Sequence, residues 1–232
     1  GPARRPFGGV WEIDFIAFLY MWADSGIVDG KRFDWWSMCA TALCIGGCLY
    51  TAGRGSFNNV QTARQRKAEW FYRDRDSFMA QLVIDVTKFA NYCRKRDIQP
   101  CIRLNGTTDI RWELILIDGK NIFELFPDVQ WYDYTKIPNR KVSHLDNYHL
   151  TWSYSAANPK YEKLFDEVIR NGMSVAVVFR KPINLKTWRG YKVVDGDKDD
   201  LRFLDPKQSI VALYAKGKAK KDNSGFVVDI AA

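Results

Sequence analysis

The second half of the chain alternates short apolar runs with polar or helical stretches, and this alternation restricts the fold more than any other feature. Apolar runs separated by helices indicate a largely parallel sheet with crossover connections. No long linker and no internal repeat interrupts the pattern. We therefore predict a single α/β domain over residues 1–232, an incomplete β/α barrel with mostly parallel strands. The runs are 101–104, 129–132, 149–154, 175–179, 191–194 and 210–214.

Helical periodicity is clearest after Asp74. Apolar residues recur there at helical spacing, with Asp74 or Asp76 as the N-cap and basic residues at 94–96 in the last turn, where cations complement the helix dipole. Cys93 falls on the apolar stripe, so we predict that it is a core side chain. Further helical segments are predicted at 161–170 and within 112–126.

Polar side chains follow the predicted strands almost without exception. In parallel α/β folds, ligands bind beyond the carboxyl ends of the strands. Asn105, Lys136, Ser153 and Asp195 each follow a different run, so we expect them to converge on one rim and line a shared pocket. The alternative is that they are ordinary polar loop residues. Other polar residues at strand ends are Thr108, Asp109, Ser155, Arg180, Asp197 and Lys216.

The chain is basic, with 35 Lys and Arg against 27 Asp and Glu and a formal charge of +8. Such an excess favours polyanions such as nucleic acid, although it can also serve solubility alone. The basic residues are clustered, which favours a nucleic-acid partner. The clusters are Arg64, Arg66 and Lys67; Arg94, Lys95 and Arg96; and Lys216, Lys218, Lys220 and Lys221.

Aromatic residues make up 15% of the chain. Trp131, Tyr134, Trp152 and Tyr154 lie near the predicted rim and could stack on a nucleobase. Because side chains alternate between the two faces of a strand, packing in the core is the favoured interpretation for most of them.

Three cysteines, Cys39, Cys44 and Cys48, lie in an irregular N-terminal segment, 1–50. Three thiolates at this spacing could hold three irons of a four-iron cluster, whereas a zinc site would need a fourth ligand from elsewhere. Buried, reduced cysteines are the third interpretation. The odd total of five cysteines argues against a disulfide framework.

The N-terminal residues do not resemble a secretory signal. The apolar run at 10–22 carries two carboxylates and is too short to span a bilayer, and 10–23 fit either a strand or a helix. We therefore predict a cytoplasmic protein with no membrane partner.

The acidic segment 195–202 offers carboxylates for a hard cation, with Asp109 and Glu113 as further ligands. The competing interpretation is a turn with a solvated ion-pair loop that includes Arg202 and Asp205. Arg54 lies in a Gly-flanked loop that could reach a phosphate or form an ordinary turn.

Several well-known motifs are absent from the sequence. It contains no Walker-type phosphate loop, no dinucleotide fingerprint and no Gly-x-Ser-x-Gly elbow. With only two His, a Ser-His-Asp hydrolase and a three-His zinc enzyme are not expected.

Seven blocks of sequence between about residues 44 and 228 carry a resemblance to a known family. Two of them are Arg103-Leu104-Asn105-Gly106-Thr107-Thr108-Asp109 and Tyr132-Asp133-Tyr134-Thr135-Lys136. In these blocks the chain resembles the phage gene product 88 family. The resemblance implies a protein encoded by phages or mobile elements. The other blocks are 48–55, 58–64, 147–151, 195–206 and 215–217.

The order of three motifs is also informative. A cysteine-rich segment ending in Cys48-Leu49-Tyr50 comes first, followed by Thr108-Asp109 and then by 134–140. This order is similar to that of a phage-associated group related to radical S-adenosylmethionine proteins, although those enzymes usually show Cys-x3-Cys-x2-Cys. The similarity implies a 4Fe-4S cluster and S-adenosylmethionine as cofactors.

Together with the strand-end positions and the Gly-flanked loop at Arg54, this resemblance leads to a set of expected roles. Cys39, Cys44 and Cys48 would hold the cluster. Asn105, Ser153, Ser155, Arg54 and Asp197 would bind the cofactor, and Asp195, Lys136 and Asp109 would be catalytic.

Three functions remain open. The first is a radical S-adenosylmethionine-like barrel protein that binds an iron–sulfur cluster and acts on or beside nucleic acid, for example in DNA modification. The second is a non-catalytic nucleic-acid-binding module on a barrel scaffold. The third is an enzyme that modifies or exchanges a base, with Asp195 as nucleophile or general base facing Lys136 or His149. For a phage-encoded protein, the expected location is the host cytoplasm.

Overall fold

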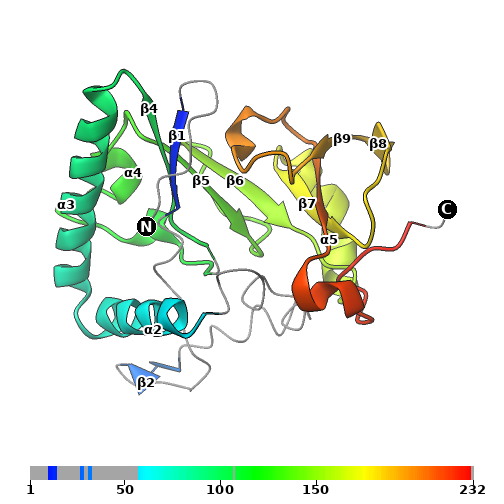
Figure 1. Ribbon diagram of the computed structural model, residues 1–232, viewed down its shortest axis with the longest axis horizontal. Helices are drawn as coiled ribbons and strands as arrows, with labels where there is room; N and C mark the ends of the chain where they lie inside the picture. Colours follow the sequence, from blue (N-terminus) through cyan, green and yellow to red (C-terminus); the bar gives the residue numbers. More distant parts are fainter. Residues whose placement is uncertain (1–9, 15–26, 29–30, 33–56, 107, 231–232) are drawn as a thin grey trace. The chain divides into compact units, whose positions relative to one another are not determined.

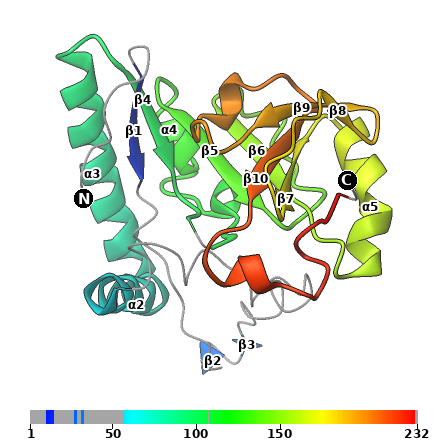
Figure 2. The ribbon, with the colours of Figure 1, turned by 45° about the vertical axis from the view of Figure 1, so that its right-hand side comes forward.

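A computed structural model of the protein describes residues 10–14, 27–28, 31–32, 57–106 and 108–230. Its central element is an eight-stranded sheet with the strand order β1-β4-β5-β6-β7-β10-β9-β8 (Figure 1; β10 is labelled in Figure 2). The strands are β1 (Val10–Asp14), β4 (Gln99–Arg103), β5 (Gln130–Thr135), β6 (Tyr148–Ser153), β7 (Ser174–Phe179), β8 (Thr187–Trp188), β9 (Tyr191–Asp195) and β10 (Ile210–Tyr214). A separate antiparallel pair joins β2 (Ile27–Val28) and β3 (Lys31–Arg32).

The sheet is mostly parallel. β1 pairs with β4, β4 with β5, β6 with β7, β7 with β10 and β10 with β9 in parallel, whereas β8 and β9 form an antiparallel hairpin. Each of the six predicted apolar runs is a strand, and the 10–23 segment begins with β1. The prediction of an α/β fold with a mostly parallel sheet is therefore confirmed.

The strand order departs from that of a regular barrel. In a β/α barrel, neighbouring strands follow chain order. Strands β4 to β7 do so, but β10 lies between β7 and β9. The reason is that the chain passes from β7 through the β8–β9 hairpin before it returns to add β10 beside β7. The barrel prediction is not confirmed, since the described strands form an open series.

The chain divides into two compact units. Unit 1 contains residues 1–22, 58–133 and 141–149, and unit 2 contains residues 23–57, 134–140 and 150–232. Strands β5 and β6 each begin in unit 1 and end in unit 2. The two units are described separately below, and the single-domain organisation stays a prediction.

Unit 1 is built on two consecutive helices, α2 (Asn58–Arg73) and α3 (Arg75–Arg94). Asp74 caps α3 by accepting a hydrogen bond from the Ser77 backbone N–H at 3.1 Å, which selects Asp74 over Asp76 as the N-cap. The predicted apolar stripe of α3 is buried, including Cys93, so this helix prediction is confirmed. Short helices η5 (Trp112–Leu114) and α4 (Ile122–Leu125) follow β4.

Unit 2 contains the adjacent parallel strands β6, β7, β10 and β9 and one long helix, α5 (Pro159–Arg170), which packs against β7 (Figure 2). Asn158 caps α5, and Pro159 occupies its first position, where a missing N–H costs nothing. The core of the unit includes Trp152, Phe165 and Phe179, all fully buried. Two 3-10 turns, η6 (Arg202–Leu204) and η7 (Gly217–Lys221), flank β10.

Candidate functional site

Lys136 and Ser153 lie side by side at the carboxyl ends of β5 and β6. The Lys136 ammonium donates to the Ser153 carbonyl at 2.8 Å and to the Tyr154 carbonyl at 3.4 Å. Its Nζ lies 5.2 Å from the centroid of the Phe226 ring, within the range of a cation–π contact. The structure thus brings together two of the four residues predicted to share a rim.

Asp195 lies farther along the same sheet. It pairs with Ala212 of β10, which in turn pairs with Val177 of β7. Asp195 is therefore separated from β6 by three inter-strand spacings of about 4.8 Å, or about 14 Å. Its carboxylate accepts a hydrogen bond from the Asp197 backbone N–H at 2.9 Å, which shapes the loop after β9. A role as nucleophile or base stays a prediction.

Position 196, between these two aspartates, requires glycine because of close packing. A Cβ placed on it would lie 2.5 Å from a Val211 methyl carbon, and its N–H already donates to Ala212 O at 2.8 Å. The glycine of the Asp-Gly-Asp sequence is thus required by the close approach of the β9 end to β10. Asp197 forms an ion pair with Lys216 at 2.8 Å, so it faces a lysine of the chain itself.

Four lysines gather at the carboxyl end of β10, on and next to η7 (Figure 2, red). Ala219 is buried and anchors the turn, whereas Lys218, Lys220 and Lys221 are exposed. Within the described part of the chain, these three lysines form no ion pair with a carboxylate. We call Lys216, Lys218, Lys220 and Lys221 the lysine cluster.

Arg180, which directly follows β7, holds the backbone of the lysine cluster by hydrogen bonds. Its guanidinium donates to Lys220 O at 3.0 Å and to Asp222 O at 2.8 Å. It also forms a two-pronged ion pair with Asp229, at 2.6 and 3.0 Å. This contact raises the pKa of Arg180 and lowers the pKa of Asp229 through the hydrogen bond between them. Arg180 therefore positions the chain after β10.

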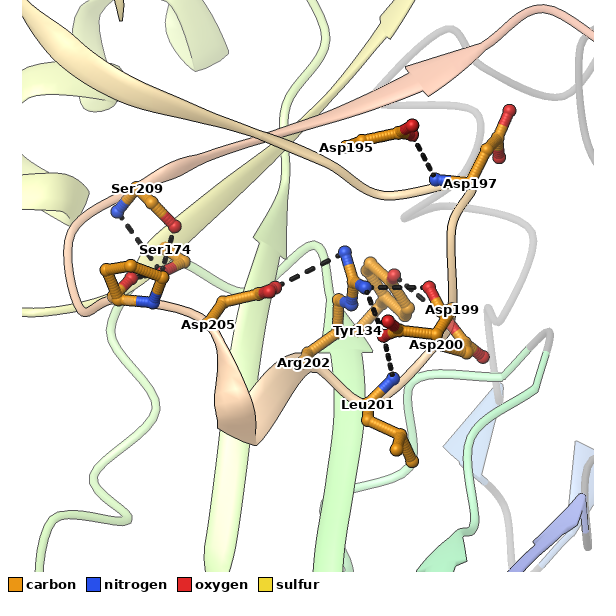
Figure 3. Close-up of polar contacts among 11 residues, drawn as sticks. Tyr134, Ser174, Asp195, Asp197, Asp199, Asp200, Leu201, Arg202, Asp205 and Ser209 are labelled. Carbon is orange, nitrogen blue, oxygen red and sulfur yellow. Dashed lines mark hydrogen bonds and ion pairs between the residues drawn. The ribbon is translucent and has the colours of Figure 1, made fainter. Parts of the chain in front are cut away.

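The acidic segment after β9 surrounds a buried arginine (Figure 3). The Arg202 side chain is 1% exposed and donates to Asp199 O and Oδ1 at 2.7 and 3.1 Å. Its Nη1 lies 3.3 Å from Asp205 Oδ2 as an ion pair. Tyr134 donates to Asp200 at 3.1 Å on the other side. The predicted ion-pair loop is present, but it is not solvated at Arg202, because the guanidinium is buried between carboxylates of its own loop.

Charge around Arg202 is balanced internally. Burial would lower the pKa of Arg202, but neighbouring Tyr134, Asp205, Asp200 and Asp199 shift it upward overall. Burial raises the pKa of Asp205, against the opposing effect of Arg202. A guanidinium occupies the centre of these carboxylates, and no group of three His, Cys, Asp or Glu among the described residues could hold a metal ion.

In unit 1, Asn105 is a fully engaged residue. Its side-chain oxygen accepts from Thr108 Oγ1, the Ile110 N–H and Trp112 Nε1, at 2.7 to 3.1 Å. Its amide donates to Ile110 O at 2.9 Å and to Asp133 at 3.3 Å. These contacts fix the loop that follows β4. Asp109 is half-buried in this loop, and its catalytic role stays a prediction.

The other basic clusters are engaged differently. At the end of α3, Arg94 donates to Asn91, and Arg96 lies over the Tyr92 ring at 3.7 Å. On α2, burial lowers the pKa of Lys67 to about 8, which Asp85 opposes and Arg66 reinforces. Lys67 is therefore only partly charged near pH 8.

The aromatic residues near the predicted rim mostly pack. Trp131, Trp152 and Tyr154 are at most 1% exposed, as strand alternation predicted. Tyr154 also forms hydrogen bonds with Glu162 and with Arg189 of the β8–β9 hairpin. Ser155 is completely buried.

Four predicted site residues, Cys39, Cys44, Cys48 and Arg54, lie outside the described residues. Their roles as cluster ligands and phosphate contact stay predictions. Among the helices that are described, none is long and apolar enough to cross a membrane.

A family model described as Gene product 88 matches residues 28–230. The chain belongs to the gene product 88 family. The match covers most of the chain and confirms the resemblance seen in its sequence blocks, and with it the assignment as a phage protein. No curated protein and no solved structure matches the chain.

Sequence reasoning missed one residue of this gene product 88 chain, Phe226, and misjudged the burial of another, Arg202. Phe226 covers Lys136, yet its Gly225-Phe226-Val227-Val228 context only signals an apolar segment. Arg202 stands between Leu201 and Phe203 in an acidic stretch, and the apolar neighbours were the available signal of its burial.

Proposed function

We propose that this phage protein is a nucleic-acid-binding protein of the host cytoplasm that contacts the phosphate backbone through the lysine cluster at the carboxyl end of β10. The single observation that carries the proposal is the exposure of Lys218, Lys220 and Lys221 on a turn anchored by Ala219. The overall formal charge of +8 supports the same partner.

The position of the lysine cluster supports ligand binding. Parallel α/β sheets bind ligands beyond the carboxyl ends of their strands, and η7 follows the carboxyl end of β10. Lysines on a short turn add positive charge without a dedicated pocket, which suits a repeating polyanion. The basic residues at and just after the end of α3 are less suited, because Arg94 and Arg96 contact Asn91 and Tyr92 of that helix.

Salt dependence of binding is the direct test. Fluorescence anisotropy with labelled single-stranded and duplex DNA and with RNA should show log affinity falling linearly with log salt concentration. Lys218→Gln with Lys221→Gln should reduce the slope by about two, since each lost phosphate contact removes about one. Lys160→Gln with Lys163→Gln, exposed on α5, is the matched control and should change the slope little. No binding at low salt would contradict the proposal.

A second candidate is a radical S-adenosylmethionine-like enzyme acting on nucleic acid. The observation that favours it is the run of strands β4 to β7, which lie in chain order as in half of a β/α barrel. Cys39, Cys44 and Cys48 would hold a 4Fe-4S cluster. S-adenosylmethionine would supply radical chemistry when bound.

The contacts in the described part fit this cofactor only in part. Asn105, predicted to bind it, uses both side-chain polar atoms within its own loop. Ser153 and Asp197 remain candidates at strand ends. Anaerobic purification followed by iron and sulfide analysis tests the candidate, with Cys39→Ala as a comparison. Iron-free, colourless protein prepared without air would contradict it.

A further inference from the structure

The C-terminal segment 222–230 of unit 2 takes over the place of β6 beside β7. Strand β6 pairs with β7 as far as Ser153, opposite Ala176. Farther along β7, Val228 forms a parallel bridge with Phe179, donates to Val178 O at 2.8 Å and accepts from the Arg180 N–H at 3.1 Å. The segment therefore covers the sheet edge at which parallel folds bind ligands. We call residues 222–230 the strap.

Phe226 of the strap lies directly against Lys136. The Phe226 side chain is 7% exposed, and its ring centroid is 5.2 Å from Lys136 Nζ. The Ser153 and Tyr154 carbonyls hold the ammonium from the other side. A positive charge held in this way attracts the face of a flat aromatic ring, and here the chain itself supplies the ring.

The strap is held by the two backbone hydrogen bonds of Val228 and by Arg180, which donates to Asp222 O at 2.8 Å and pairs with Asp229. The Arg180–Asp229 ion pair lies near its end, with Asp229 64% exposed. Near its start, Asp222 accepts from the Val227 N–H at 3.1 Å, a contact within the strap. Gly225, with φ of 93°, crosses over Ala157, and a Cβ there would lie 3.4 Å from the Ala157 backbone. Because the Asp229 carboxylate is exposed, loss of its ion pair with Arg180 loosens this end of the strap. Displacing the strap further also uncovers Phe226 and Val227, which are buried.

We infer that the carboxyl-end site at Lys136 binds a flat aromatic ring, an unpaired nucleobase, and that Phe226 occupies this place until the strap is displaced. The inference rests on the proposed nucleic-acid function and extends it from the phosphate backbone to a base. It explains why a half-buried lysine stands at a strand end beneath an aromatic side chain. A duplex, whose bases are paired and stacked, does not compete with Phe226.

Two variants loosen the strap. Phe226→Ala removes the competing ring, and Asp229→Asn removes the carboxylate that holds Arg180 without changing the core. The apparent affinity of a site is proportional to the fraction of molecules in which that site is open. Both variants should raise this fraction and therefore bind labelled single-stranded DNA about fivefold or more tightly than wild type. Adding Lys136→Met to either variant should abolish the gain.

The control for altered charge is Asp166→Asn, an exposed position on α5 of the same unit. It should change affinity far less than Asp229→Asn does. If Asp229→Asn and a folded Phe226→Ala bind single strands no more tightly than Asp166→Asn, the inference is overturned. An equal gain for single strands and duplexes also overturns it, because that is an effect of charge alone.

A second measurement does not depend on nucleic acid. Acetylation of lysines by an amine-reactive ester, mapped by mass spectrometry, should be faster at Lys136 in Asp229→Asn than in wild type, with exposed Lys163 unchanged. An unchanged acetylation rate at Lys136 would overturn the inference that the strap covers this lysine. If Lys136 becomes reactive but no form of the protein binds nucleic acid, then the strap stands and the proposed function and its nucleobase fail.

Discussion

A buried polar network in unit 1, around Asn105, and another in unit 2, around Arg202, are built on different principles. In unit 1, the neutral amide of Asn105 meets the single carboxylate of Asp133, and each polar atom of the Asn105 side chain has a hydrogen-bond partner. In unit 2, the charged Arg202 stands among three aspartates. Among the described residues, Arg202 Nε, Arg202 Nη1 and Asp205 Oδ2 are buried without a hydrogen-bond partner.

The difference shows which network holds the chain in one conformation and which one retains an uncompensated free-energy cost of burial. A buried polar group that is fully hydrogen-bonded rigidifies its surroundings, whereas an unsatisfied one retains a desolvation cost of about 1–3 kcal/mol. The Asn105 network therefore holds one loop in one conformation. The Arg202 network is held by charge, so it responds strongly to loss of a partner and more weakly to pH.

The largest effect is expected from Arg202→Met. This change keeps much of the buried volume but leaves Asp199 and Asp205 without their counter-charge, and breaking a buried pair costs about 3–5 kcal/mol. Urea denaturation followed by circular dichroism measures the loss. Adding Asp205→Asn should recover part of it, because the buried carboxylate is then removed as well. A loss below about 1 kcal/mol would show that the guanidinium is solvated.

Asn105→Ala should be the next most destabilising change, by about 2–3 kcal/mol. It leaves Thr108 and Trp112 without their buried acceptor and removes one of the donors to Asp133. The control is Asn91→Ala on the exposed face of α3, where we expect about 0.5 kcal/mol or less. Equal unfolding free energies for the two variants would contradict a structural role for Asn105.

Two tyrosines allow a matched comparison of the networks. Tyr148 donates to Asp133 at 3.0 Å in unit 1, and Tyr134 donates to Asp200 at 3.1 Å in unit 2. Tyr148 is buried and Tyr134 is half-buried. Tyr148→Phe should therefore cost about 1–2 kcal/mol and Tyr134→Phe less than about 1 kcal/mol. The reverse order in thermal or urea unfolding would contradict the comparison.

The smallest effect should come from the titration of Asp205. Burial raises the pKa of Asp205 above 3.8, so the folded protein keeps its proton to higher pH than the unfolded chain does. Its contribution to stability is present at low pH and falls as pH rises from about 3.8 through the raised pKa. The unfolding free energy of wild type minus that of Asp205→Asn should therefore decrease over this window. A difference that increases with pH would reverse the sign and contradict the raised pKa.

The sequence placed the strands at the correct residues but did not reveal how the candidate site is assembled. Lys136 and Ser153 meet as predicted from adjacent parallel strands. Asp195 does not join them, because insertion of β10 between β7 and β9 adds one strand spacing to the distance. The position of β10 depends on pairing between distant strands, and no local pattern encodes it.

What the sequence determined by itself is the set of elements whose burial has a local period. The stripe of α3 with Cys93 and the six apolar runs follow from the spacing of apolar side chains, since that spacing fixes which face leaves water. Only the tertiary structure decided that Arg202 points inward among aspartates and that Phe226 lies on Lys136. The contacts of Phe226 with Lys136 and of Tyr134 with Asp200 join residues far apart in the chain and depend on the path of the backbone between them. Arg202 pairs with aspartates only three residues away, but the burial of its loop depends on that same path.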